Sequence, residues 1–98
     1  MNTTENNKII AEFIGWKEQE EDFMFNPKTN GSIYIKSLLF HKDWNWLMEV
    51  VEKIKPLVSE SEFKYRIGKH LLNLNIEAVY NACVEFIKWY NEKSADKN

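Results

Sequence analysis

The chain has 98 residues and a net charge of −2, which is enough length for one small domain and too little positive charge to favour nucleic acid or an anionic membrane. Its hydrophobic content of 44% is well above that of disordered chains, so we expect one domain over residues 1–98, ordered over about 4–92 with a frayed tail at 93–98. The single cysteine excludes an internal disulfide framework, and the lack of a signal-peptide pattern or a long apolar run predicts a cytoplasmic protein with no membrane contact.

The first predicted element is a helix over residues 4–14. Its apolar residues recur on one side at the 3.6-residue period: Ile9, Ile10, Phe13 and Ile14. Gly15 is placed to end this helix in the left-handed conformation, with Trp16 folding back as an apolar contact. The acidic segment 17–22 that follows is typical of a solvated loop.

A β-hairpin is predicted next. Two apolar runs, Phe23–Phe25 and Ile33–Ile35, flank a segment that contains Pro27 and the pair Asn30-Gly31. Asn-Gly supplies the positive φ angles of a tight turn, and proline ends a strand because it has no N–H to donate. The hairpin is expected to lead into a central helix.

That central helix is predicted from the capping residue Asp43 to a stop at Lys55-Pro56. Its apolar residues form a wide stripe typical of a helix that faces a core: Trp44, Leu47, Met48, Val50, Val51 and Ile54. Trp46 falls at the border of the stripe. A tryptophan there either fills the edge of the core or anchors an interface.

Residues 63–67 alternate strictly between apolar and basic side chains, which predicts a half-buried strand. In that strand Lys64 and Arg66 would face solvent, and Gly68 would end it. The segment 69–74 remains ambiguous between a short strand and a helical turn. The basic side chains, with exposed aromatic residues nearby, could form a strip for a nucleic acid, or they could simply keep the sheet soluble.

The last predicted helix spans residues 75–91. Its apolar stripe is continuous: Ile76, Val79, Tyr80, Cys83, Phe86, Ile87 and Tyr90. Cys83 lies within this stripe, so we expect a core thiol and not a nucleophile. Trp89 lies at the border, like Trp46. Together these elements predict an α+β fold of three helices on a small, mostly antiparallel sheet of three or four strands.

Three segments, Ile10–Lys17, His41–Ile54 and Cys83–Asn91, resemble the phage ABA (α-β-α) sandwich domain family. Members are small proteins associated with phages and prophages of gut Bacteroidetes. The resemblance implies helices on both sides of a sheet and a phage-derived accessory role. It implies no catalytic, cofactor-binding or metal-binding residue.

Catalytic and phosphate-binding motifs are missing from the sequence, so we do not expect an enzyme or a cofactor. His41, Asp43 and His70 could in principle hold a metal, but a helix cap beside a packed ring is the simpler interpretation. The leading hypothesis is a non-enzymatic interaction domain that contacts a copy of itself or a phage or host protein, with Trp46 and Trp89 as candidate anchors. The alternative is a nucleic-acid-binding module that uses Lys64 and Arg66 on a basic sheet face.

Overall fold

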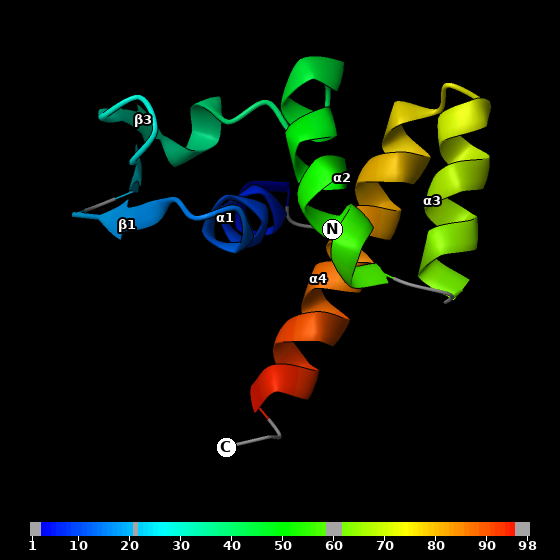
Figure 1. The fold of residues 1–98 in the computed structure, drawn as a ribbon. Coiled ribbons are helices and arrows are strands. Elements are labelled where there is room, and N and C mark those ends of the chain that lie inside the picture. Colours follow the sequence, from blue (N-terminus) through cyan, green and yellow to red (C-terminus); the bar gives the residue numbers. More distant parts are fainter. Residues whose placement is uncertain (1–2, 21, 59–61, 96–98) are drawn as a thin grey trace.

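The computed structural model describes residues 3–20, 22–58 and 62–95 (Figure 1). In chain order its elements are α1 (Thr3–Phe13), β1 (Lys17–Gln19), β2 (Phe23–Asn26), β3 (Gly31–Tyr34), the 3₁₀ turn η1 (Ile35–Ser37), α2 (Trp44–Val58), α3 (Glu62–Leu72) and α4 (Ile76–Ala95). The α+β class predicted from the sequence is confirmed. The described part holds four α-helices where three were predicted.

The sheet has three antiparallel strands in the order β1-β2-β3. The predicted hairpin is confirmed, with Phe23 paired to Tyr34 and Met24 to Ile33. Met24 is fully buried, so this row of the sheet faces the core. Most strand residues of the other face stay exposed, so the sheet is covered on one side.

Strand β1 corrects the prediction of a loop over residues 17–22. Its residues are all exposed and charged or polar, so the sequence has no apolar alternation that would predict a strand here. It forms because its backbone pairs with β2 and because the Glu18 carboxylate lies 2.9 Å from the Lys8 ammonium on α1. Both contacts depend on residues outside the strand and not on a pattern within it.

Two backbone positions with positive φ, Gly15 and Asn30, lie where the sequence predicted them. Gly15 has a φ of 102°, and the Trp16 N–H donates to the Ala11 carbonyl at 2.9 Å, which closes α1 as predicted. In the hairpin turn Asn30 has a φ of 59°, and its N–H donates to the Asn26 carbonyl. Gly31 does not share this conformation, so the prediction of a positive φ at both turn residues is wrong for Gly31.

Helix α2 continues through Pro56 to Val58, so the predicted stop at Lys55-Pro56 is wrong. Proline removes the N–H that would bond the Glu52 carbonyl. Glu52 and Pro56 are both exposed, so water can replace that bond. Val58 is buried and holds the last turn against the core.

Residues 63–67 lie in helix α3 and not in a strand. Phe63 and Ile67 are four residues apart, a spacing that puts them on the same face of a strand and also on the same face of a helix. That face packs against α4, where the Phe63 and Phe86 ring centroids lie 5.5 Å apart. Tyr65, predicted to point inward with them, is exposed, and Gly68 lies inside the helix.

Helix α4 contacts α1, α2 and α3, so it is the centre of the helical layer (Figure 1). The Asn75 side chain caps its start by accepting from the Ala78 N–H at 3.1 Å. The predicted stripe is confirmed as core or core-packed, with Cys83, Phe86 and Ile87 fully or almost fully buried. The helix reaches Ala95, past the predicted end at residue 91, and residues 96–98 of the predicted tail lie outside the described residues. None of the described helices combines the length and apolar character needed to cross a membrane.

Candidate functional site

An apolar groove of about 270 Å³ lies between α2 and α3. Its deepest residues are Ile54 and Ile67, which are buried in the core. Met48 and Val51 on α2 and Leu71 on α3 form its walls. A hollow bounded by two helices and lined mainly by aliphatic side chains is the geometry in which proteins receive the apolar side of a helix.

Gly68 lines the groove with no side chain of its own. Gly68 lines the groove one residue after Ile67, and a Cβ added there would meet no atom within 4 Å. Glycine in a helix interior costs roughly 0.5–1 kcal/mol relative to alanine. A residue with a side chain at position 68 should therefore be tolerated in α3, with room for the side chain to extend.

Charged side chains line the rim unevenly. Lys55 of α2 and Lys64 of α3 both lie toward the connection between the two helices, and Glu52 lies about one turn earlier on α2. The rim residues thus contribute two positive charges and one negative charge.

Helix α3 also presents two exposed apolar side chains, Tyr65 and Leu72, beside the groove. Tyr65, Gly68 and Leu72 recur at i, i+3 and i+7, so they share one side of the helix. Tyr65 is 69% exposed, Leu72 is 87% exposed and the following Leu74 is 79% exposed. Leu74 has a φ of 55°, a left-handed conformation that costs a non-glycine residue about 1–2 kcal/mol.

The two tryptophans at the stripe borders, predicted either to fill the core edge or to anchor an interface, differ in their surroundings. Trp46 is half-buried in a ring cluster, 5.2 Å from Phe40 and 6.0 Å from Trp16 between ring centroids. Its packing is that of a residue at the edge of the core. Trp89 is 43% exposed, packs beside Phe63 and lies under the Lys93 ammonium, so part of its ring remains on the surface.

Lys64 and Arg66 do not form a basic sheet face. Both lie on α3, where two residues of separation place them about 200° apart around the helix. The Arg66 guanidinium binds the Glu85 carboxylate of α4 and lies 3.9 Å from Glu62. The nucleic-acid alternative assumed that Lys64 and Arg66 lie side by side on a strand. They do not, because this segment is a helix.

A buried polar network that the sequence did not reveal joins α1 to α4. The Tyr80 hydroxyl donates to the Asn7 Oδ1 at 2.9 Å, and the Asn7 Nδ2 donates to the Leu38 carbonyl at 3.2 Å. The Asn7 Nδ2 also lies 3.0 Å from the His41 Nδ1. Burial raises the pKa of Tyr80 to about 12, so the phenol remains a donor at neutral pH.

This network defines the role of His41. Because the Leu38 carbonyl and the Tyr80 hydroxyl orient the Asn7 amide, its Nδ2 donates to the His41 Nδ1, which must be unprotonated. Asp43 caps α2 by accepting from the Asn45 N–H at 2.8 Å. Within residues 3–20, 22–58 and 62–95, no three His, Cys, Asp or Glu side chains come together in a metal-binding group.

Acid should weaken the fold through His41. Burial, and to a lesser extent the charge of Lys42, lower the pKa of His41 below the value of 6.5 for an unperturbed histidine. The unfolded chain therefore takes up this proton first, and the stabilisation present above pH 6.5 is lost as the pH falls through the folded-state pKa. Urea unfolding from about pH 8 to about pH 5 should show the loss, and His41→Gln should flatten the curve. Parallel curves for the two proteins would contradict this assignment.

Cys83 is confirmed as a core thiol. It is fully buried on α4, and burial raises its pKa to about 12. A nucleophilic cysteine needs an accessible thiolate at neutral pH. Cys83 is inaccessible and protonated.

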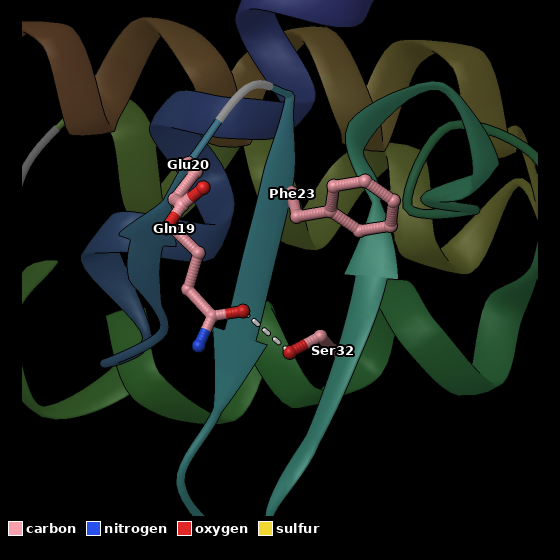
Figure 2. A pocket seen from close by; sticks show the side chains of 4 residues that line it. All are labelled: Gln19, Glu20, Phe23 and Ser32. Atoms are coloured by element: carbon pink, nitrogen blue, oxygen red, sulfur yellow. Dashed lines mark hydrogen bonds between the residues drawn. The ribbon is translucent and has the colours of Figure 1, made fainter.

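A wider hollow of about 510 Å³ lies on the outer face of the sheet (Figure 2). Figure 2 shows the Phe23 ring over β3 and the Gln19 side chain reaching across β2, where its oxygen accepts from the Ser32 hydroxyl. Three of its four lining residues, Gln19, Glu20 and Ser32, are polar and exposed. The groove between α2 and α3 is smaller, but its apolar lining makes it the stronger candidate for binding.

No family model, curated protein or solved structure matches this chain. Its class is therefore defined by architecture: a small α+β protein with a three-stranded antiparallel sheet and an interhelical groove. The groove is the feature on which a function can be argued.

Proposed function

We propose that this protein is a non-enzymatic protein-interaction domain whose α2–α3 groove receives the apolar side of a partner helix. The main support is the combination of an apolar floor at Ile54 and Ile67 with open space at Gly68. Filling such a groove with aliphatic side chains removes apolar surface from water, which contributes about 25 cal/mol per Å². No reacting group is required.

The rim charges suggest what the partner helix carries. Its apolar residues would recur at i, i+3 or i+4 and i+7 to follow the groove. Lys55 at one end favours a carboxylate there, or the C-terminal end of the helix with its partial negative charge. We therefore propose an amphipathic, acidic helix as the ligand.

The resemblance to the phage ABA sandwich family fits this proposal, because a small accessory protein can act by contact alone. We propose a phage-derived origin on that resemblance. Trp89, part of whose ring remains exposed, would be a second and separate contact.

A synthetic helix of about 14 residues, with leucines on one side and glutamates elsewhere, tests the groove directly. Titrated into the ¹⁵N-labelled protein, it should shift the amide resonances of Val51, Gly68 and Leu71. A peptide of the same composition, scrambled so that its leucines surround the helix, is the matched control. It should shift those resonances at least tenfold less at equal concentration.

The variant Gly68→Phe links the effect to the groove. Its ring should occupy the open space, and the loss of a helix-interior glycine should keep the variant folded. Binding of the patterned peptide should fall by at least tenfold. If both peptides bind equally, or if Gly68→Phe binds as well as the wild type, the groove is not the binding site.

A further inference from the structure

A hollow of about 290 Å³ lies between the β2–β3 hairpin and the first turns of α2, and we call it the tryptophan hollow because Trp16 and Trp46 line it. We infer that it binds a quaternary or otherwise N-methylated ammonium group. Two indole rings and the Glu49 carboxylate line it together, and their combination carries the inference. The tryptophan hollow shares no lining residue with the α2–α3 groove, so it is independent of the proposed function.

Trp16 and Trp46 supply the aromatic wall. Their ring centroids lie 6.0 Å apart, and the ring planes are inclined to each other by 48°. Phe40, which is buried, lies 6.1 Å from Trp16 and 5.2 Å from Trp46 between ring centroids. This three-ring cluster holds both indoles in place before a ligand arrives, which lowers the entropy cost of binding. The face of an indole ring attracts a cation that lies within about 6 Å of its centroid.

The charge of the tryptophan hollow is negative. Glu49 is exposed, and among the described lining residues it is the charged one. Within the described part of the chain, no cationic side chain lies at ion-pair distance from its carboxylate. Glu49 stands three residues after Trp46 on α2, so the two side chains are neighbours on one side of the helix. A cation over the Trp46 ring would therefore lie close to a carboxylate that has no other counter-charge.

The remaining lining residues favour methyl groups on that cation. Ile33 pairs with Met24 in the core-facing row of the sheet and gives the hollow an aliphatic side chain. A primary ammonium is strongly hydrated and carries three N–H donors that need acceptors. Methyl groups replace these donors with apolar surface, which the indole rings and Ile33 can contact. The volume is near the lower limit for small-molecule sites, about 300 Å³, and therefore suits a small head group.

Choline tests the site, and its neutral isostere dimethylbutanol, in which carbon replaces the nitrogen, is the matched control. Choline should bind with a Kd on the order of 1 mM, and the alcohol at least tenfold more weakly. In the ¹⁵N-labelled protein, choline should shift the indole N–H resonances of Trp16 and Trp46. The resonance of Trp89, which packs on Phe63 and Phe86, should not move. Equal binding of choline and the alcohol would overturn the inference.

Two charge variants on α2 link binding to the tryptophan hollow. Glu49→Gln should weaken choline binding at least tenfold and leave the fold intact, because the side chain is exposed. Glu52→Gln removes the same charge from the same helix but lines the α2–α3 groove, so it should change the Kd less than twofold. If Glu49→Gln binds choline as the wild type does, or if both variants lose binding equally, the carboxylate of Glu49 is not part of a site.

Trp46→Leu tests the aromatic wall. Leucine keeps apolar bulk at the edge of the core but removes the ring, so choline binding should again fall at least tenfold. Far-ultraviolet circular dichroism shows whether this variant is folded, and if it is not, the two charge variants decide. A folded Trp46→Leu variant that binds choline normally would contradict the assignment.

The ammonium group can belong to a free small molecule or to a methylated lysine of another protein. A short peptide with one trimethyl-lysine, compared with choline, separates these sources: tighter binding of the peptide assigns the ligand to a protein, and weaker binding assigns it to a free molecule. The same peptide with unmodified lysine should bind at least tenfold more weakly than the methylated one. Equal binding of the two peptides would overturn the requirement for N-methylation, while the α2–α3 groove would be unaffected.

Discussion

Replacing Phe86 with alanine should lower the free energy of unfolding by about 3–5 kcal/mol. Phe86 is 1% exposed, and its ring centroid lies 6.5 Å from that of Phe13 on α1 and 5.5 Å from that of Phe63 on α3. The ring therefore joins three helices, and its removal leaves a cavity that none of them can close alone. Domains of this size are stable by about 5–15 kcal/mol, so a large part of the stability should be lost.

Urea unfolding followed by tryptophan fluorescence and far-ultraviolet circular dichroism measures this change. Trp89→Ala is the matched control, because its ring lies 5.9 Å from that of Phe86 in the same cluster but is 43% exposed. It should cost clearly less than Phe86→Ala, about 1–2 kcal/mol. An equal or larger loss for Trp89→Ala would mean that Phe86 is not the centre of the helical core.

The second large effect is expected at Asn7, where Asn7→Leu should destabilise the protein by about 2–4 kcal/mol. Leucine is close to asparagine in volume, so packing changes little. The Leu38 carbonyl loses its hydrogen bond from Asn7, and the buried Tyr80 hydroxyl keeps only the Thr3 carbonyl at 3.5 Å. The cost arises because buried polar groups that lose their partners are not rehydrated.

A double-mutant cycle with Tyr80→Phe provides the control. Once Asn7 is replaced, removing the Tyr80 hydroxyl removes an unsatisfied group, so the double variant should cost less than the sum of the two single variants. The coupling should be about 1 kcal/mol. Strictly additive losses would show that the hydrogen bond between Tyr80 and Asn7 contributes nothing to stability.

The sequence by itself determined the elements whose signals are local. The 3.6-residue stripes of α2 and α4 and the caps at Gly15 and Asp43 depend on residues within a few positions of one another. The hairpin over residues 23–34 follows from turn chemistry in the same way. Cys83 could also be assigned to the core, because an apolar stripe on a long helix leaves no doubt about its side.

The tertiary structure decided the elements whose patterns fit two answers. From their alternation alone, residues 63–67 are predicted to form a strand, but the spacing of Phe63 and Ile67 fits the period of a helix as well. Packing against Phe86 selects the helix. The helix then separates Lys64 from Arg66 and brings Arg66 to Glu85. The Asn7 network likewise depends on partners far away in the chain, and strand β1 depends on pairing with β2 and not on a pattern of its own.

The candidate site belongs to this second group. Met48, Val51 and Leu71 look like ordinary core residues in the sequence, and Gly68 looks like the end of a strand. They become a groove only because α2 and α3 pack on α4 at a separation that leaves space over Gly68. Periodicity shows which side of a helix is apolar, but only the packing of three helices decides how much of that side stays open to a partner.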